Sequence, residues 1–169
     1  MFEDEASFGR INEPSYCWCP RGVRPTVPCL RVREYVYVFG ASDPIDGEFF
    51  SIVAPKCNTD WMNAFLLELS KTYPTDYILM PCDQAGWHKS KGLSIPENIE
   101  LIYIPPRTPE MNPQEQIWKE VRKHGFKNTL IKTLDKVVDK LCNVLPHIDN
   151  SIVKSITGRA WITSMFNGK

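Results

Sequence analysis

YVYVFGASDPIDGEFFSIVA, residues 35–54, supplies the first half of the predicted architecture. Its opening part, Tyr35–Ala41, is β-branched, aromatic and apolar, which is typical of a strand. The segment Asp43–Gly47, DPIDG, has Pro and Gly at turn positions, and Glu48–Ala54 has the composition of a returning strand. These residues therefore predict an antiparallel hairpin.

Helix and strand patterns alternate on the C-terminal side of this hairpin. Asn58, Thr59 and Asp60 offer N-caps for a helix whose apolar residues recur at helical spacing, at Trp61, Phe65, Leu66 and Leu69. Two short apolar runs predict buried strands, Tyr77–Met80 before Asp83 and Ile99–Ile104 before Pro105 and Pro106. A further helix is expected from near Pro113, and a last one carries the stripe Leu134, Val137, Val138, Leu141 and Leu145.

The N-terminal side of the hairpin is less regular. Residues 11–30 are rich in Pro, Cys, Gly and Arg and predict a long irregular loop. Only Met1, Phe2 and Glu3 precede Asp4, so we expect a first strand of three or four residues that holds the Asp4 carboxylate loosely. An antiparallel hairpin followed by strands with helical crossovers predicts an α/β fold, with a mixed sheet flanked by helices.

Length and composition are those of a globular protein. The 169 residues, 43% hydrophobic and 24% charged, are enough for one domain with a core. The sequence has no apolar run of the roughly 20 residues that cross a bilayer, and its acidic start differs from a secretory signal, so we expect a cytoplasmic protein that has no contact with a membrane. Net charge is zero, but residues 119–169 carry ten Lys/Arg against four Asp/Glu. This basic tail fits either phosphate binding or a solvated helix surface.

Six cysteines offer a possible metal site that the spacing does not favour. Cys17, Cys19 and Cys29 cluster, but they lack the paired C-x-x-C spacing of structural zinc sites and have no neighbouring His. We therefore interpret the cysteines as reduced, partly buried thiols.

Three acids are candidates for a divalent-metal site. Mg²⁺ prefers hard oxygen ligands, and Asp83 stands at the end of a buried apolar run, where a sheet opens to solvent. Glu115 is also explained by a capping box with Asn112 as N-cap and Pro113 as first helical residue. Asp4 lies in the acidic triplet Glu3-Asp4-Glu5, which also fits a charged chain end.

Three sequence blocks combine these acids. They are DEASFGR at residues 4–10, DQAGWH at residues 83–88 and PPRTPEMNPQEQIW at residues 105–118. In this order and spacing they resemble the DDE transposase domain of bacterial insertion sequences in the mariner-like superfamily. The resemblance covers nearly the whole chain, including the tail around Ser155–Ile162, and the third block is its most specific part.

The resemblance implies a ribonuclease H-like fold with a mixed five-stranded sheet and a catalytic triad of Asp4, Asp83 and Glu115. These residues would bind two Mg²⁺ or Mn²⁺ ions, which activate water and then a freed 3′-hydroxyl for attack on DNA. The implied partners are double-stranded DNA, as transposon ends and target, and a second copy of the chain on that DNA. His88 matches a histidine that contacts DNA, steadies the metal site or orders a loop, and Trp118 would pack beneath Glu115 and orient it.

Basic residues supply candidate phosphate contacts. These are Arg21, Arg24 and Arg31 in the long loop, with Lys119, Arg122 and Lys123 after the third block. For each of them, an exposed solvating charge is the alternative interpretation.

The chain also departs from the family pattern. We expect 1–169 to be a single catalytic domain without the usual N-terminal helix-turn-helix region, as a fragment, one frame of a split gene or a decayed copy. Gln84, Gln114 and Arg107 are unusual at their positions, and Pro81 removes a ladder donor. Two alternatives follow: a catalytically silent remnant that binds DNA or itself, and a ribonuclease H-like nuclease acting on another substrate such as RNA–DNA hybrids.

Overall fold

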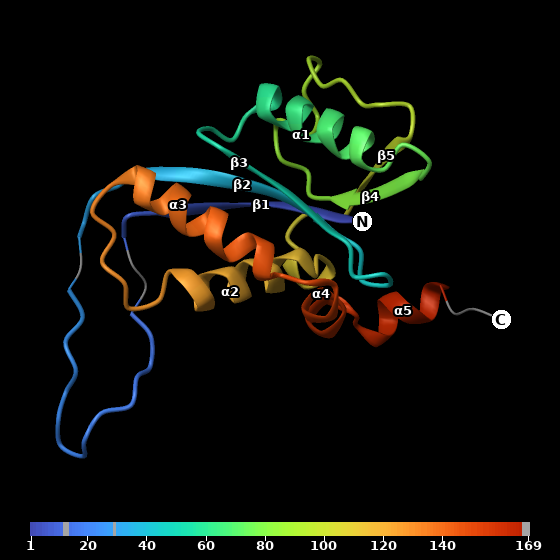
Figure 1. Ribbon diagram of the computed structural model, residues 1–169. Helices are drawn as coiled ribbons and strands as arrows, with labels where there is room; N and C mark the ends of the chain where they lie inside the picture. The colour runs from blue at the N-terminus through green and yellow to red at the C-terminus, as the bar shows by residue number, and fades with distance from the viewer. Residues whose placement is uncertain (12–13, 29, 167–169) are drawn as a thin grey trace.

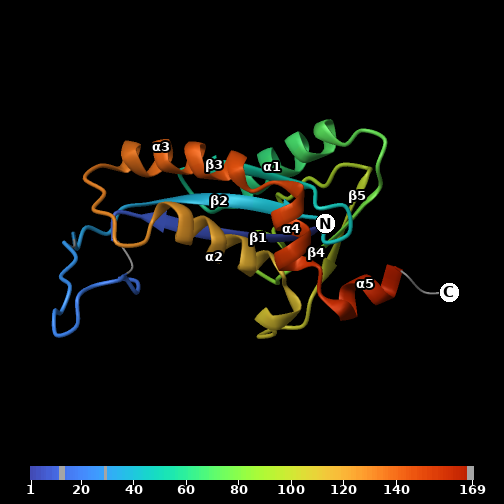
Figure 2. The same cartoon turned by 60° about the horizontal axis from the view of Figure 1, so that its bottom comes forward.

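A computed structural model describes residues 1–11, 14–28 and 30–166. Its strands and helices form layers, with the strands between helix α1 and the group α2 to α4 (Figures 1 and 2). In the described part of the chain, no helix is both long and apolar enough to cross a lipid bilayer.

Three strands form an antiparallel sheet in the order β1-β2-β3. They are β1 (Phe2–Gly9), β2 (Tyr35–Ser42) and β3 (Phe49–Ala54). The predicted hairpin is confirmed: the turn between β2 and β3 closes with Gly47 N–H donating to Asp43 O, and Gly47 adopts φ 77°, which favours glycine.

Strand β1 corrects the expectation of a very short first strand. It continues past Asp4 for five residues and pairs with β2 along its full length, so that Asp4 lies opposite Gly40. The Asp4 carboxylate is therefore carried by a paired eight-residue strand rather than held loosely at a chain end.

Two further strands pair in parallel, β4 (Ile78–Cys82) and β5 (Ile99–Tyr103). Helix α1 (Thr59–Thr72) precedes β4, and the Asn58 side chain accepts from Trp61 N–H at 3.1 Å, as the predicted N-cap does. The expected combination of antiparallel and parallel strands with helices is confirmed.

The five strands are hydrogen-bonded in two ladders rather than in one. Strand β4 lies beside β1, and Met1 N donates to Leu79 O at 2.9 Å. Ile78 and Cys82 direct backbone groups toward the β5 side, so by the alternation of a strand Leu79 and Pro81 direct theirs toward β1. Pro81 has no N–H, and the junction between β1 and β4 therefore loses a donor where a continuous ladder needs one.

Two apolar cores lie on opposite sides of β2. Val36 and Val38 pack with residues of α2 (Gln114–Gly125), α3 (Leu134–Val144) and α4 (Asn150–Thr157). Phe39 and Ala41 pack with α1, β4 and β5. The chain ends in α5 (Ala160–Phe166), and short 3-10 turns, Pro109–Met111 and Leu145–His147, precede α2 and follow α3.

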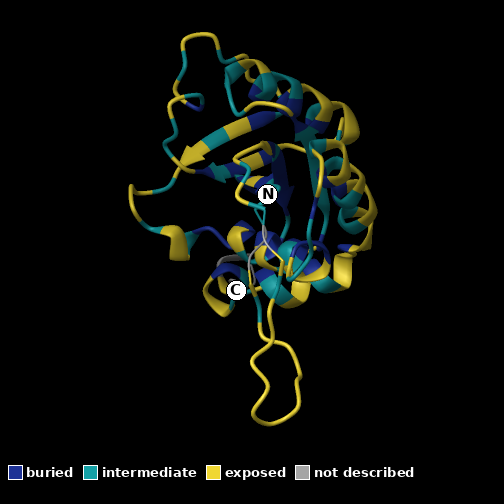
Figure 3. Cartoon of the chain, turned by 90° about the vertical axis from the view of Figure 1, so that its left-hand side faces the viewer, coloured by how far each residue is buried: buried dark blue, intermediate teal, exposed yellow. Residues whose placement is uncertain are grey.

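The predicted irregular loop projects from the sheet as an arm, defined here as the described residues 10–11, 14–28 and 30–34 (Figures 1 and 3). An ion pair joins the two ends of the arm, with Arg10 Nη1 at 2.7 Å from Glu34 Oε2. Within the arm, the side chains of Tyr16 and Trp18 are fully exposed.

Cysteines occur without disulfides in the described residues. Cys17, Cys19 and Cys142 are free and exposed, Cys57 is half-buried and Cys82 is buried. The prediction of reduced thiols agrees with this, although Cys17 and Cys19 are exposed rather than partly buried. Cys29 lies outside the described residues.

Gly40→Ala tests the contact between the sheet and α2. An added Cβ would lie 2.5 Å from Trp118 Cη2 and 2.7 Å from Gln114 Nε2, so we expect overpacking to lower the free energy of unfolding by about 1–3 kcal/mol. Urea denaturation measures the change. Gly86→Ala is the control, because its Cβ meets nothing within 4 Å. Equal midpoints for the two variants would contradict this packing.

Candidate active site

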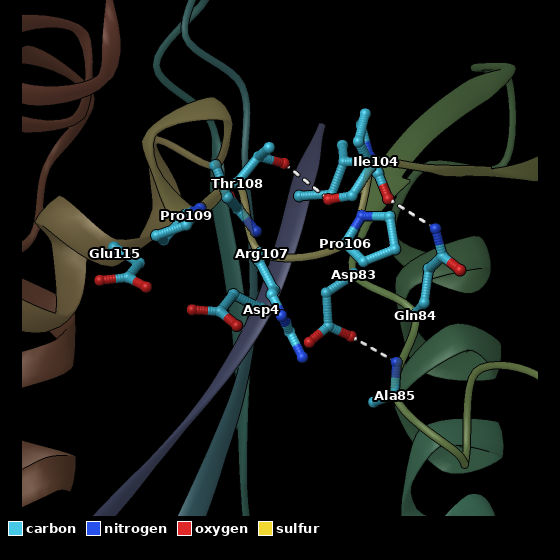
Figure 4. A pocket seen from close by; sticks show the side chains of 12 residues that line it. Asp4, Asp83, Gln84, Ala85, Ile104, Pro106, Arg107, Thr108, Pro109 and Glu115 are labelled. Carbon is cyan, nitrogen blue, oxygen red and sulfur yellow. Dashed lines mark hydrogen bonds between the residues drawn. The ribbon is translucent and has the colours of Figure 1, made fainter.

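One open pocket brings together residues from four separated segments (Figure 4). Asp4 comes from β1, Asp83 follows β4, Arg107 follows β5, and Glu115 lies in the first turn of α2. The three acids singled out in the sequence thus line the same pocket, although 111 positions separate the first from the last.

Asp4 is the most buried acid of the three. Trp118 Nε1 donates to its Oδ2 at 2.9 Å, from a helix packed against the strand. Burial raises the pKa of the Asp4 carboxyl to about 7, and the charges of Glu5 and Glu115 act in the same direction. The Trp118 hydrogen bond opposes this by stabilising the ionised form. Trp118 therefore orients Asp4, a contact that the sequence did not predict, and its expected role beneath Glu115 stays a prediction.

Asp83 is reachable from solvent, with 54% of its side chain exposed. Its Oδ1 accepts from Ala85 N–H at 2.8 Å and lies 3.0 Å from His88 Nδ1. Both contacts come from the loop directly after β4, so this loop fixes the direction of the carboxylate at the strand end.

The contacts around Glu115 bear on the two roles that the sequence offered for it, helix capping and metal binding. Asn112 Oδ1 accepts from Gln114 N–H at 3.1 Å, so the Asn112 half of the predicted capping box is present. The reciprocal half is not formed, because Asn112 N–H donates to Pro109 O. Glu115 is exposed and lines the pocket instead.

His88 is buried, with 1% of its surface exposed, and its ring contacts the pocket acid Asp83. Its Nδ1 faces Asp83, and its Nε2 lies 3.0 Å from Glu5 Oε1, which also accepts from Trp87 Nε1 at 2.5 Å. Burial lowers the pKa of the His88 imidazole, but the hydrogen bond and charge of Glu5 outweigh this and raise it. Burial excludes the DNA-contacting role considered for His88 and agrees with the supporting one.

The sequence did not predict the contact of Glu5 with His88 or the contact of Asn112 with β1. Glu5 was grouped with a charged chain end, although the alternation of a strand places it on the face opposite Asp4. Asn112 Nδ2 donates to Glu3 O at 2.7 Å and so attaches the loop before α2 to β1. Neither contact has a local sequence signal, since each joins residues more than 80 positions apart.

The predicted phosphate-binding residues lie outside the pocket. Arg21, Arg24 and Arg31 are exposed on the arm, and Lys119 is exposed on α2. Arg122 stacks on the Phe8 ring at 4.9 Å, and Lys123 pairs with Glu120 at 3.0 Å. None of these six residues lines the pocket, although Lys119 lies one helical turn after Glu115 on α2.

The pocket is suited to divalent cations of the hard type. Carboxylate oxygens are the ligands that Mg²⁺ and Mn²⁺ prefer, and mutual repulsion among the acids favours a bound cation. Arg107, with φ 63°, extends toward Asp4 and Asp83 as a fixed positive charge (Figure 4).

Comparisons with known proteins identify a matching family model and a related sequence. The family model described as DDE superfamily endonuclease matches residues 1–138. The uncharacterized protein y4pE/y4sA of Sinorhizobium fredii (strain NBRC 101917 / NGR234) is 36% identical over 97 residues, which cover 57% of this chain and 72% of that protein.

Solved structures of Mos1 transposase are similar in fold. A pre-cleavage Mos1 transpososome matches with a TM-score of 0.70 at 13% identity, over 99% of this chain and 55% of that chain. The Mos1 mariner paired end complex with Mn gives 0.68 at 13% identity, over 99% and 55%. The chain thus spans about half the length of these transposase chains, and at this identity the likeness concerns the fold.

Asp4→Asn tests the electrostatics of the pocket. A carboxyl whose pKa rises on folding from 3.8 to about 7 opposes folding when ionised, so its destabilising effect grows as pH rises through this interval and is complete above it. We expect Asp4→Asn to raise the Tm of the metal-free protein at about pH 8, with the difference vanishing near pH 4. Calorimetric melting at both pH values measures this.

Asp76→Asn, which removes an exposed acid before β4, serves as the control and should leave Tm unchanged at both pH values. Added Mg²⁺ should raise the Tm of the wild type at about pH 8 more than that of Asp4→Asn. A wild type and Asp4→Asn that melt together at every pH would refute the burial of this charge.

Proposed function

This chain belongs to the DDE superfamily endonucleases, and from this membership we propose that it is the catalytic domain of an insertion-sequence transposase, which cuts DNA and joins the freed strand to a target. The observation that carries the proposal is the shared pocket of Asp4, Asp83 and Glu115, built from segments far apart in the sequence. The resemblance to Mos1 in fold supports the same assignment.

We extend the proposal to the sheet. The order β3-β2-β1-β4-β5 is that of a five-stranded ribonuclease H-like sheet, supported by the adjacency of β1 and β4 and by the bond from Met1 N to Leu79 O. In this arrangement Asp4 and Asp83 come from neighbouring strands, and α2 carries Glu115 to the same edge.

Asp4, Asp83 and Glu115 would hold two Mg²⁺ or Mn²⁺ ions. When bound, such ions lower the pKa of an attacking hydroxyl and offset charge on the phosphate. Trp118 keeps the Asp4 carboxylate turned toward the pocket, while Ala85 N–H and His88 keep Asp83 turned toward it. These contacts limit the rotation of the Asp4 and Asp83 side chains. A two-ion site requires ligands that are held in fixed directions.

The partner in this proposal is double-stranded DNA, as transposon ends and target. The arm supports it, because residues 14–33 contain four arginines and no acidic residue. Arg21 and Arg24 are exposed there, beside the exposed rings of Tyr16 and Trp18. Since the similar Mos1 structures are paired-end complexes, we propose that two copies of this chain act together on DNA, in the bacterial cytoplasm.

Asp83→Asn should abolish metal-dependent nicking. The substitution keeps the shape of the side chain and removes the charge of a carboxylate that would hold the metal, so we expect activity on supercoiled DNA with Mn²⁺ to fall at least about a hundredfold. Conversion of supercoiled to open-circular plasmid measures this, with Asp76→Asn as the matched exposed control.

Other results would point elsewhere. Equal nicking by wild type and Asp83→Asn would overturn the assignment of the acids. Salt-sensitive DNA binding by a folded wild type with no cleavage in Mg²⁺ or Mn²⁺ would identify a catalytically silent remnant. Cleavage of RNA–DNA hybrids but not of duplex DNA would identify a different nuclease.

The double variant Arg21→Ala/Arg24→Ala tests the arm. Each phosphate contact releases about 0.9 counterion, so losing two should flatten the slope of log K against log salt by about two units. Fluorescence anisotropy with duplex DNA measures the slope. Lys56→Ala/Lys71→Ala removes equal charge from exposed residues outside the arm, before and within α1, and should leave the slope unchanged.

A further inference from the structure

A second group of metal-binding side chains lies behind the acid-lined pocket. Glu3, Cys82 and His88 each offer one donor atom, and these atoms lie within 4.8 Å of one another. All three residues are buried. Glu3 belongs to β1, Cys82 ends β4, and His88 follows in the next loop, so the group spans the junction between the two ladders.

Glu3 is the anomalous member of this group. Its side chain is fully buried, and neither carboxylate oxygen has a hydrogen-bond partner. An unpaired ionised carboxylate is costly in a protein interior, and buried polar groups nearly always find a partner. A cation bound here would give the buried Glu3 carboxylate the partner that it lacks.

His88 is arranged as a metal-ligating imidazole would be. Its Nδ1 lies 3.0 Å from Asp83 Oδ1 and 3.1 Å from Asp83 O, where an N–H donates. With the proton on Nδ1, the Nε2 lone pair faces Glu3 Oε2 at 3.3 Å and Glu5 Oε1 at 3.0 Å. A carboxylate behind the second nitrogen is the usual support of a metal-bound histidine, because it fixes the tautomer and the ring.

The donor set selects the class of ion. A thiolate, an imidazole and a carboxylate suit Zn²⁺ and similar transition ions, whereas Mg²⁺ takes oxygen ligands and binds thiolates poorly. We propose that Glu3, Cys82 and His88 form a buried site for Zn²⁺ or a like transition ion, distinct from the acid-lined pocket.

Such an ion would join β1 to β4 where Pro81 removes a ladder hydrogen bond. Glu3 and Cys82 belong to the two strands concerned, and His88 leads on to the carboxylate of Asp83. The site would thus stabilise the junction and the direction of Asp83 together. It does not depend on the proposed transposase activity, because its ligands are not the three pocket acids.

The competing arrangement contains no metal. A protonated His88 could bridge Glu3 and Glu5 by itself, as the two distances from Nε2 allow. Cys82 distinguishes the two arrangements, since a proton bridge gives its thiol no role and a metal site makes it a ligand.

Co²⁺ titration of the full chain in excess Mg²⁺ tests the proposal, because a cobalt–thiolate bond absorbs in the near ultraviolet and a cobalt–carboxylate bond does not. Cys17, Cys19 and Cys29 are replaced by serine, so that the clustered cysteines do not bind the ion. We expect one equivalent of Co²⁺ to produce the thiolate band, Zn²⁺ to remove it, and Cys82→Ser to abolish it. Glu3→Gln should keep the band and weaken Co²⁺ binding at least about tenfold.

Two controls separate this site from others. Glu115→Gln removes a pocket acid and should leave the band and its affinity unchanged, while Cys142→Ser removes an exposed thiol and should do the same. Far-ultraviolet circular dichroism checks that each variant is folded. A folded background protein that binds Co²⁺ without the band, or a band that survives Cys82→Ser, would overturn the proposal and leave the protonated bridge. Nicking with Mg²⁺ alone reports separately on the proposed function.

Discussion

The alternation of side chains along β1 is the constraint on which the rest of the site depends. Glu3, Asp4 and Glu5 are consecutive, so a paired strand must send the middle carboxylate to one face and its neighbours to the other. Asp4 meets Trp118 of α2, whereas Glu5 meets Trp87 and His88. One acidic triplet therefore supplies both the open pocket and the buried layer behind it, and neither could be moved without moving the other.

Burial of so much negative charge shapes the chemistry of this region. Burial raises the pKa of the Glu3 and Asp4 carboxyls, and the charges of neighbouring acids act in the same direction. Arg107 is the cation that faces the pocket. A protein that concentrates carboxylates in this way favours whatever positive species can enter, and the direct ligands then determine whether a hard or a soft ion is held.

Local chemistry made part of the structure predictable from the sequence. The turn at Asp43–Gly47 and the N-cap at Asn58 depend on neighbours in the chain, and both were predicted correctly. The length of β1 was not, because Glu5–Gly9 becomes a strand only by pairing with β2 across the whole arm. The hydrogen bond from Trp118 to Asp4 was not predicted for a similar reason, since the two residues lie 114 positions apart. The acids of the pocket were found through the combination of motifs, and their catalytic role remains a prediction.

Strand β2 belongs to both apolar cores. Its even-numbered residues Val36 and Val38 complete the core beneath α2 to α4, and its odd-numbered residues Phe39 and Ala41 complete the core beneath α1. Loss of this strand would expose both cores at once, so both layers of helices depend on the same strand. The helices on the two faces are thereby tied into one cooperative unfolding unit, and amide hydrogen exchange in the middle of β2 should require opening of the whole unit.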